Sequence, residues 1–232
     1  MRLQDKIAIV TGAGSGFGAG IARKFAAEGA RVVVADLNGD ADRAIAEDVG
    51  GIAVTANVAP EDGIRAMTEA ALNLVGRVDI LVNNAGVTHL PSPMEEVSEA
   101  DFDRILAVNC KAIYLAARTI VPLMKAQKSG AIVNIASTAG VSPRPRLSWY
   151  NASKGWVITA TRAMAVELAP FGIRVNALNP VAGETPLLAS FMGEDTPEMR
   201  AKFLSTIPIG RFSTPEDLGN AACFLASDEA SM

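Results

Sequence analysis

The stretch Lys6–Gly18, KIAIVTGAGSGFG, joins a short apolar run directly to a cluster of glycines. The run Lys6–Thr11 is typical of a strand, and the segment after the glycines has helical spacing, with Ile21, Phe25 and Ala26 on one face. Glycines between a strand and a helix let the backbone approach a pyrophosphate, which the free N–H groups of the helix N-terminus can bind. The stretch therefore predicts a strand, a phosphate-binding turn and a helix.

The glycine pattern fits the general dinucleotide fingerprint only in part, through Gly14, Gly16 and Ala19. Taken alone, it also allows a glycine-rich turn without a ligand. Asp36 favours a ligand, because it ends the second apolar run about 20 residues further on, where an acid can bind the hydroxyls of an adenosine ribose. In the alternative interpretation, Asp36 caps a turn together with Asn38.

Apolar runs alternate with longer helical patterns along the rest of the chain. Several runs are apolar at consecutive positions, as expected for strands covered on both faces. The pattern predicts one α/β domain over residues 1–232, a Rossmann-type doubly wound parallel sheet with helices on both faces. Residues 182–209 are the least regular segment and are predicted to form a substrate-covering loop or lid. The predicted strands after the first are Arg31–Asp36, Ile52–Asn57, Asp79–Asn84, Ala131–Ser137 and Arg174–Asn179.

The composition favours a soluble cytoplasmic protein that binds small molecules. A formal net charge of -4 argues against a nucleic-acid or anionic-membrane surface. Cys110 and Cys223 are far apart and match no metal or redox spacing, so we expect two reduced core cysteines and no metal site. The apolar segment 106–124 is interrupted by Asn109, Lys111 and Arg118, and no membrane span is predicted.

The motif WYNASKG, residues 149–155, places Tyr150 and Lys154 four residues apart, on one face if the segment is helical. An ammonium beside the phenol would lower its pKa from about 10, and a positively charged nicotinamide ring would lower it further. A pKa of about 7 requires about 4 kcal/mol of differential stabilisation. The pair could then act as a general acid and base on a hydroxyl or carbonyl group. Taken alone, the same spacing is more often a solvated pair on a helix surface.

Together these stretches resemble the short-chain dehydrogenase/reductase family of NAD(P)-dependent oxidoreductases, from the first strand to the last residue. The family's glycine pattern falls on Thr11, Gly12, Gly16 and Gly18, which settles the register of the turn. The other matching motifs are NNAG (Asn83–Gly86), Asn109 in AVNCK, Ser137 in NIAS, YNASK (Tyr150–Lys154), and NP (Asn179–Pro180) with Thr185.

The resemblance implies a catalytic set of four residues. Tyr150 would be the general acid/base, and Lys154 would lower its pKa and bind the nicotinamide ribose. Ser137 would bind the substrate oxygen, and Asn109 would anchor a water in a proton relay that reaches Lys154. The residues alone leave Ser137 and Asn109 equally open to capping or core-polar roles.

The resemblance also implies a set of cofactor contacts. The stretch Asn83–Gly86 would line the side of the adenosine ribose, and Asn57 would meet the adenine. NAD is predicted over NADP, because the Asp36 carboxylate would repel a 2′-phosphate and residues 12–19 contain no Arg or Lys. The predicted cofactor-binding residues are Gly12, Ser15, Gly16, Phe17, Gly18, Asp36, Leu37, Asn57, Val58, Asn84, Ala85, Gly86, Tyr150, Lys154, Pro180 and Thr185.

Two stretches depart from the family pattern. Val181 stands where a glycine usually follows NP, so the family pattern does not predict the course of the backbone from Val181 to Thr185. The chain ends at Met232, where the family usually continues through another strand and a tail, and we expect that C-terminal strand to be absent from this chain. Substrate contacts by His89, Arg144 and Arg146 stay open, with ordinary loop and surface roles as the alternatives.

The leading hypothesis is an NAD(H)-dependent oxidoreductase that interconverts an alcohol, either a secondary alcohol or a sugar hydroxyl, and a carbonyl. An NADPH-dependent 3-oxoacyl-carrier-protein reductase is the alternative, and Asp36 opposes it. A non-catalytic dinucleotide sensor is opposed by the intact set of Ser137, Tyr150 and Lys154. The expected partner is a small-molecule alcohol or carbonyl substrate, with a homotetramer or dimer implied by the resemblance alone.

Overall fold

The computed structural model describes residues 1–231 and contains one six-stranded sheet in which every strand pairing is parallel. Each strand lies within two residues of its predicted bounds, and the predicted fold class is confirmed. The strands are β1 (Ile7–Thr11), β2 (Arg31–Asp36), β3 (Ile52–Thr55), β4 (Ile80–Asn83), β5 (Gly130–Ile135) and β6 (Ile173–Leu178).

The strand order β3-β2-β1-β4-β5-β6 reverses direction between β1 and β4. The chain winds outward from β1 to β3 on one side and then from β4 to β6 on the other. The loops that leave the carboxyl ends of β1 and β4 therefore diverge, and a crevice opens between them. This switch point is where open α/β sheets bind their ligands.

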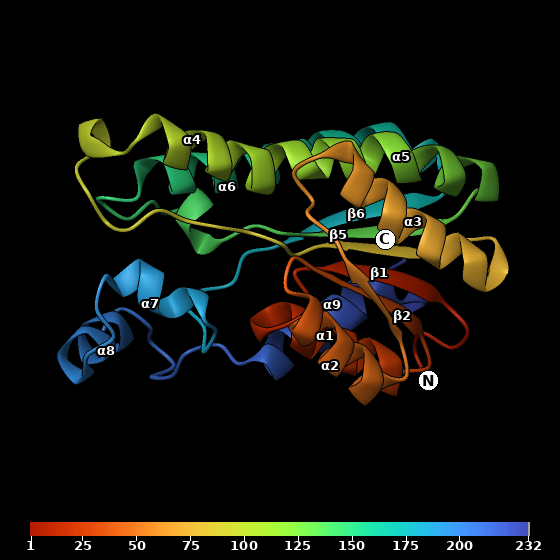
Figure 1. Cartoon of the computed structure of the whole chain (residues 1–232), viewed down its shortest axis with the longest axis horizontal. Coiled ribbons are helices and arrows are strands. Elements are labelled where there is room, and N and C mark those ends of the chain that lie inside the picture. The colour runs from red at the N-terminus through yellow and green to blue at the C-terminus, as the bar shows by residue number, and fades with distance from the viewer. Residues whose placement is uncertain (232) are drawn as a thin grey trace.

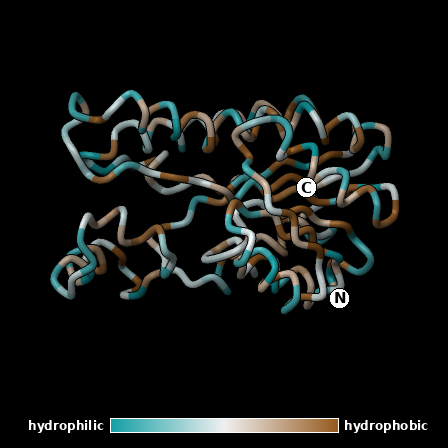
Figure 2. The backbone as a smooth tube through the Cα atoms, in the orientation of Figure 1, coloured by the Kyte–Doolittle hydropathy of each residue, from teal (hydrophilic) through white to brown (hydrophobic). Residues whose placement is uncertain are grey.

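Helices cover both faces of the sheet, as Figure 1 shows. The strands between the two layers are apolar on both sides: Ile7 and Ile9 of β1 face one layer, and Ala8 and Val10 face the other. Hydrophobic residues accordingly run along the central strands in Figure 2, and hydrophilic residues gather on the outer turns. One layer holds α1 (Gly16–Ala27), α2 (Gly39–Val49) and α9 (Pro215–Ala226), and the other holds α3 (Glu61–Val75), α5 (Ala112–Gln127) and α6 (Ser148–Leu168).

Side chains cap the starts of two helices. Ser98 Oγ accepts a hydrogen bond from the backbone N of Asp101 at 3.1 Å at the start of α4 (Glu99–Ile105). Thr214 and Asp217 form a reciprocal capping box ahead of α9, with Pro215 at its first helical position. These caps fix the residue at which each loop ends and its helix begins, so the length of the loop is defined.

One long helix runs from Glu99 to Gln127 through α4, a π-helical turn and α5. Among the described residues, it is the one helix long and apolar enough to cross a membrane, although the sequence analysis took its polar residues to interrupt the segment. Half of its apolar window is buried inside the protein. Its apolar residues, such as Leu115 and Ile120, pack in the core against the sheet, which accounts for its hydropathy.

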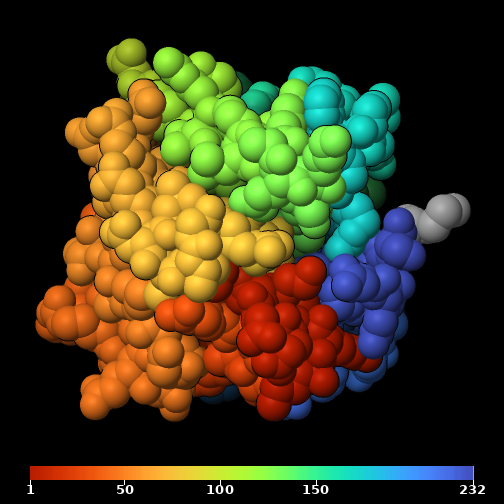
Figure 3. Space-filling model, turned by 90° about the vertical axis from the view of Figure 1, so that its right-hand side faces the viewer, coloured from red at the N-terminus to blue at the C-terminus, as the bar shows by residue number. Residues whose placement is uncertain are grey.

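The segment after β6 is not a single irregular loop but carries two short helices, α7 (Leu187–Met192) and α8 (Pro197–Leu204). They lie apart from the two helical layers, at the carboxyl ends of the strands (Figure 1). Leu188, Met192, Ile207 and Phe212 form a small core of their own there. The opposite end of the molecule, seen in Figure 3, shows α3 and α5 packed side by side. The site therefore has to be sought at the end that carries α7 and α8.

Candidate functional site

The carboxyl ends of β1 and β4 open into a cleft of about 470 Å³. It lies at the point where the strand order reverses, and its volume is in the range of about 300–1,000 Å³ found for small-ligand sites. Most of the predicted site residues line it, although they come from segments spread between Gly12 and Pro186. The fold therefore brings the predicted residues together in one place.

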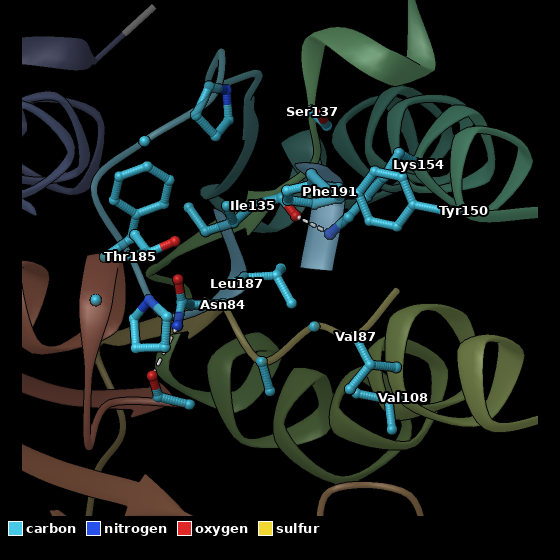
Figure 4. A pocket seen from close by; sticks show the side chains of 18 of the residues that line it. Asn84, Val87, Val108, Ile135, Ser137, Tyr150, Lys154, Thr185, Leu187 and Phe191 are labelled. Carbon is cyan, nitrogen blue, oxygen red and sulfur yellow. Dashed lines mark hydrogen bonds between the residues drawn. The ribbon is translucent and has the colours of Figure 1, made fainter. Parts of the chain in front are cut away.

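Two loops at the centre of the cleft are bonded to each other. Thr11 Oγ1 accepts hydrogen bonds from the backbone N of Asn84 at 3.0 Å and of Ala85 at 3.1 Å. Asn84 Nδ2 donates to the carbonyl oxygens of Thr11 at 2.8 Å and of Gly12 at 3.0 Å (Figure 4). The side chains of Thr11 and Asn84 thus hold the glycine-rich turn against the start of the loop after β4.

The glycine-rich turn has the shape and the free donors of an anion site. Gly12 and Gly16 have φ values of 61° and 51°, a region that side chains with a Cβ rarely adopt. A Cβ on Gly12 would lie 2.9 Å from Ala85 Cα, and one on Gly16 would lie 3.0 Å from Thr185 Cβ. Helix α1 begins here, and its N-cap Ser15 makes no side-chain cap bond. The N–H groups of the first turn are therefore available to a pyrophosphate.

Two predicted residues lie behind the cleft rather than in it. A Cβ on Gly18 would lie 2.1 Å from the carbonyl oxygen of Gly12, so Gly18 lets α1 pack against the turn and does not line the cleft. Asn83 is buried in β4, and its Nδ2 donates to Asn134 Oδ1 at 2.8 Å. Both are packing residues here, because the chain itself occupies the space beside them.

Asp36 forms one end of the cleft at the carboxyl end of β2. Its Oδ2 accepts from the backbone N of Gly14 at 2.8 Å, and its Oδ1 accepts from the backbone N of Asn38 at 3.0 Å. The carboxylate therefore caps the turn, as the alternative interpretation expects, and it also lines the cleft, where a ribose could reach it. The cleft is also lined by Leu37, Ala56, Asn57 and Val58, which follow β2 and β3.

Tyr150 and Lys154 lie on α6, one turn apart and both buried. Lys154 Nζ donates to the carbonyl oxygen of Ile135 at 2.8 Å and lies 5.8 Å from the centre of the Tyr150 ring. Figure 4 shows both side chains with Ser137 at the same end of the cleft. Ser137 Oγ accepts from the backbone N of Ala139 at 3.1 Å and forms a hydrogen bond with the Tyr150 side chain.

The pKa of Tyr150 runs opposite to the expectation from the sequence. Burial raises the pKa of Tyr150 to about 12, while its hydrogen bond with Ser137 acts in the lowering direction. Burial also lowers the pKa of Lys154 to about 8, with Cys110 acting in the raising direction. The Lys154 ammonium is bonded to Ile135, so in the protein alone it does not offset the desolvation of the phenol. Tyr150 therefore keeps its proton at neutral pH.

Asn109 sits in the π-helical turn Leu106–Lys111 that joins α4 to α5. Its Oδ1 accepts from the backbone N of Val87 at 2.9 Å, and its Nδ2 donates to the carbonyl oxygen of Val87 at 2.9 Å and to Ser153 Oγ at 3.0 Å. The carboxamide thus makes bonds to the protein at both ends, as the core-polar interpretation expects. A water held by Asn109 would need its backbone carbonyl instead.

The loop after β6 forms the rim of the cleft. Pro180 accepts hydrogen bonds at its carbonyl oxygen from the backbone N of Thr138 at 3.1 Å and from Thr138 Oγ1 at 3.3 Å. Thr185 comes close to Gly16, although Val181 replaces the family's glycine. Both Pro180 and Thr185 line the cleft, so the altered loop still returns to the glycine-rich turn.

Helices α7 and α8 close the side of the cleft beyond Tyr150. The Phe191 ring of α7 packs edge-on to the Tyr150 ring, with 5.0 Å between the ring centres. Leu187 of α7 and Phe203 of α8 also line the cleft. All three side chains fall within residues 182–209, the segment predicted to form a lid, but the sequence did not single out Phe203. It also missed the carbonyl of Ile135, which binds Lys154 through the backbone and leaves no side-chain signature.

The sequence left open whether His89, Arg144 and Arg146 contact the substrate, and the structure places the three residues differently. Arg144 lines the cleft, and Arg146 does not; the latter is exposed and directs its guanidinium toward the carbonyl oxygen of Pro91 at 3.4 Å. His89 is buried and lines a second cavity of about 500 Å³ beside α4, with its Nδ1 2.8 Å from the carbonyl oxygen of Leu90.

The cleft as a whole fits an extended dinucleotide. Asp36 can bind ribose hydroxyls at one end, the N–H groups of the α1 N-terminus can bind phosphates in the middle, and the Lys154 ammonium can bind hydroxyls at the other end. A Cβ on Gly86 would lie 3.4 Å from Lys154 Nζ, so a glycine there leaves the ammonium reachable from the cleft. The reacting end of such a ligand would lie beside Tyr150.

Comparison with known proteins agrees with this arrangement. Residues 12–232 match a family model described as enoyl-(acyl carrier protein) reductase. The chain is 47% identical over its whole length to 4-formylbenzenesulfonate dehydrogenase from Comamonas testosteroni and covers 94% of it. It is 38% identical over its whole length to 3-oxoacyl-[acyl-carrier-protein] reductase from Thermotoga maritima, again covering 94% of that protein.

A solved structure shows the same fold. The crystal structure of 3-ketoacyl-(acyl-carrier-protein) reductase from Brucella melitensis, complexed with NADH, superposes with a TM-score of 0.94 at 48% identity. The superposition covers 99% of this chain and 94% of that one.

Proposed function

Because this chain belongs to the short-chain dehydrogenase/reductase family of oxidoreductases, which act with a nicotinamide dinucleotide, we propose that it is NAD(H)-dependent and uses Tyr150 as its general acid/base. The substrate is a small secondary alcohol or sugar hydroxyl, or the corresponding carbonyl compound. The single observation that carries the choice of NAD is the Asp36 carboxylate, which lines the cleft and accepts a bond from the glycine-rich turn.

In this proposal, Ser137 and Tyr150 bind the substrate oxygen and Tyr150 exchanges its proton. A bound nicotinamide supplies or accepts the hydride at the carbon that carries this oxygen. In carbonyl reduction, Tyr150 donates its proton to the oxygen as the hydride arrives, and Ser137 stabilises the developing charge. The raised pKa of Tyr150 supports this direction, since the buried phenol starts protonated.

Oxidation of an alcohol requires the reverse transfer, in which Tyr150 takes up the hydroxyl proton. The positive charge of an oxidised nicotinamide beside the phenol would lower its pKa for this step. Lys154 holds the ribose of the cofactor and, through its ammonium, adds to the same effect. Phe191 and Leu187 limit the access of water to the Tyr150 end of the cleft.

Electrostatics at the Asp36 end support NAD over NADP. Among the described residues, Arg144 and Lys154 are the cations that line the cleft, and both belong to segments around Tyr150. A 2′-phosphate near Asp36 would face a like charge, worth about 4 kcal/mol per unit-charge pair at ~4 Å and an effective dielectric of ~20. Even if solvent removed half of this repulsion, NAD would still bind more than about tenfold more tightly than NADP.

Calorimetric titration of the purified protein with NADH and with NADPH at one salt concentration tests the cofactor. We expect NADH to bind more tightly by about tenfold or more, and the Asp36→Asn variant to lose most of this preference. Tighter binding of NADPH by the wild-type protein would overturn the assignment.

A 3-oxoacyl-carrier-protein reductase is the second candidate function. The relatives from Thermotoga maritima and Brucella melitensis carry that description, and the latter was solved with NADH, so the activity does not exclude NAD here. The relative from Comamonas testosteroni is named instead for a small aromatic aldehyde. Turnover of acetoacetyl carrier protein compared with small ketones distinguishes the two candidates.

We also propose a cytoplasmic homo-oligomer, a tetramer or dimer, that interacts with neither membranes nor nucleic acid. Exposed apolar side chains on α5 and α6, such as Tyr114, Trp156 and Val166, support an interface on this layer. Light scattering on the purified protein measures the assembly, and a monomer at micromolar concentration would contradict it.

A further inference from the structure

The part of the cleft beyond Tyr150 is lined mainly by apolar side chains and by one half-buried cation. Apolar and aromatic side chains of α7, α8 and the segment before α6 line it, and Arg144 stands among them. Lys154, the other cation of the cleft, is buried and directed toward Ile135. The apolar lining consists of Leu147, Leu187, Phe191 and Phe203.

Arg144 is held in place without an ion pair to a carboxylate of the described residues. Its guanidinium carbon lies 4.5 Å from the centre of the Phe203 ring, and Nη2 donates to Thr206 Oγ1 at 3.1 Å. The Nδ2 of Asn151, on α6, donates to the carbonyl oxygen of Arg144 at 2.7 Å, which fixes this residue relative to the catalytic helix. Loop and helix thus present the guanidinium at the cleft in a defined position.

No carboxylate of residues 1–231 lies within 4.0 Å of the Arg144 guanidinium. Other arginines nearby are paired: Arg200 contacts Asp195 and Glu184, and Arg211 contacts Asp217. A guanidinium has five N–H donors, and the bond to Thr206 uses one of them. Arg144 therefore faces the cleft with most of its N–H donors free and with no acidic partner among the described residues.

We propose that Arg144 binds a carboxylate or sulfonate group of the substrate, whose apolar body lies between this anion and the reacting carbon. This inference rests on the proposed function, because it takes Tyr150 as the reacting end. A planar guanidinium binds an oxoanion through two parallel N–H···O bonds, and an apolar surrounding strengthens them. The substrate class is then a small hydroxy acid or oxo acid with a hydrophobic ring or chain.

A purely structural role for Arg144 makes a different prediction. If Arg144 only holds α8 through Phe203 and Thr206, its loss would reduce turnover of charged and neutral substrates equally. If it binds the substrate anion, only the charged substrate loses affinity. Arg146 provides the matched control, since it lies two residues away, is exposed, makes no ion pair within the described chain, and does not line the cleft.

The test compares 4-oxocyclohexanecarboxylate with its neutral carboxamide as ketone substrates, following the consumption of NADH. Hydride from NADH reduces the carbonyl carbon and Tyr150 supplies the proton to the oxygen, so each ketone gives its alcohol and NAD+. We expect kcat/KM of the wild-type protein to favour the carboxylate about tenfold or more.

In Arg144→Met, kcat/KM for the carboxylate should fall by about tenfold to a hundredfold, while that for the carboxamide changes less than about twofold. The kcat/KM of Arg144→Lys for the carboxylate should lie between those of the wild type and Arg144→Met, because lysine keeps the charge but lacks the planar, two-pronged guanidinium. Arg146→Met should match the wild type. Equal losses on both ketones in Arg144→Met would overturn the proposal.

A binding measurement covers the case in which neither ketone is reduced. Titration of the NADH-saturated protein with benzoate and with benzamide should show tighter binding of benzoate, and Arg144→Met should remove the difference. Equal binding to the wild type would overturn the anion site. A separate titration of the protein with NADH tests the proposed function. Turnover of the carboxamide with no preference for the carboxylate would support that function and contradict the role of Arg144.

Discussion

Tyr150 and Lys154 share one face of α6, but their surroundings separate them. The phenol meets Ser137 and the Phe191 ring, whereas the ammonium is directed to the carbonyl oxygen of Ile135. Desolvation acts on both side chains and disfavours the charged form of each. In the protein without cofactor, the phenol is therefore protonated and the ammonium is desolvated. A positively charged cofactor would lower the pKa of the phenol, so that Tyr150 could act as a base.

Substitution of Tyr150 by Phe should remove the proton donor and leave the cleft intact. We expect kcat to fall by about a hundredfold to ten-thousandfold, with NADH affinity changed by less than about twofold. Steady-state kinetics and calorimetric titration measure the two quantities. The other tyrosine, Tyr114, is half-exposed on α5, and Tyr114→Phe should behave as the wild type. Normal turnover by Tyr150→Phe would rule out the proposed mechanism and favour a dinucleotide sensor.

Lys154 should make the stability of the cofactor-free protein depend on pH. Its pKa is about 8 in the folded protein and 10.5 for an ordinary lysine in water, so between these two values the unfolded chain binds more protons than the folded one. The free energy of unfolding therefore rises with pH across this window. Urea denaturation of the wild type and of Lys154→Met at pH 7 and pH 10 measures the effect.

The difference in stability between the wild type and Lys154→Met should shift in favour of the wild type as the pH rises. Subtraction of the variant removes the opposing contribution of Cys110, whose raised pKa of about 11 lowers stability at high pH. A difference that stays constant between the two pH values would show that Lys154 keeps an ordinary pKa in the folded protein.

At the scale of elements, the site depends on the close approach of α1 to its neighbours. A Cβ on Gly18 would lie 2.1 Å from the carbonyl oxygen of Gly12, and one on Gly20 would lie 2.2 Å from that of Pro215. Helix α1 thus packs closely against the glycine-rich turn on one side and the start of α9 on the other. The position of its N-terminus at the cleft follows from these two contacts.

Gly20→Ala should destabilise the protein even though alanine is the better helix former. The added methyl meets backbone atoms that cannot move without separating α1 from α9, which we expect to cost about 1–3 kcal/mol. Gly155→Ala on α6 is the matched control, because its Cβ would meet only Gly140 O at 3.7 Å, an ordinary contact. That variant should be neutral or more stable by up to about 1 kcal/mol. Chemical denaturation measures both, and equal stabilities would contradict the contact argument.

At the scale of the whole molecule, the protein has two main cores against the sheet and a small one under α7 and α8. The small core contains four buried apolar side chains, far fewer than either of the others. Arg200 adds surface ion pairs to Asp195 and Glu184, and such pairs contribute only about 0–1 kcal/mol each. The wall of the cleft formed by α7 and α8 therefore has less buried support than the two helical layers.

Hydrogen exchange should reveal this difference. Amides of α7 and α8 should exchange faster than those of β1, β4 and β5, because local opening of the small core costs less than unfolding of the sheet. Saturating NADH should slow exchange at Thr185 and α7, which lie at the rim of the cleft. Mass-spectrometric exchange with and without NADH measures both effects, and protection of α7 equal to that of β4 would contradict the prediction.

Local sequence patterns predicted the strands, the glycine-rich turn with the helix after it, and the positions of the motifs with small errors. Apolar runs and glycine turns depend on residues within a few positions of one another, so they can be read without the fold. The NNAG, YNASK and NP motifs lie on different segments, and their meeting at one cleft followed from the parallel order of the strands. The irregular segment 182–209 was harder, because its short helices are stabilised by a small core that brings in Phe212 from beyond the segment.

The sequence by itself determined the α/β domain, the glycine-rich turn after its first strand and the spacing of Tyr150 and Lys154, because these features lie in local patterns of residue type and spacing. Its resemblance to the short-chain dehydrogenase/reductase family added Ser137 to the same set. Only the tertiary structure decided that the pKa of Tyr150 is raised, that Gly18 packs against the chain, and that Arg144 faces the cleft without an acidic partner. Desolvation, steric contact and charge pairing depend on what the whole fold places within a few ångströms of a side chain. Those neighbours come from residues far apart in the chain.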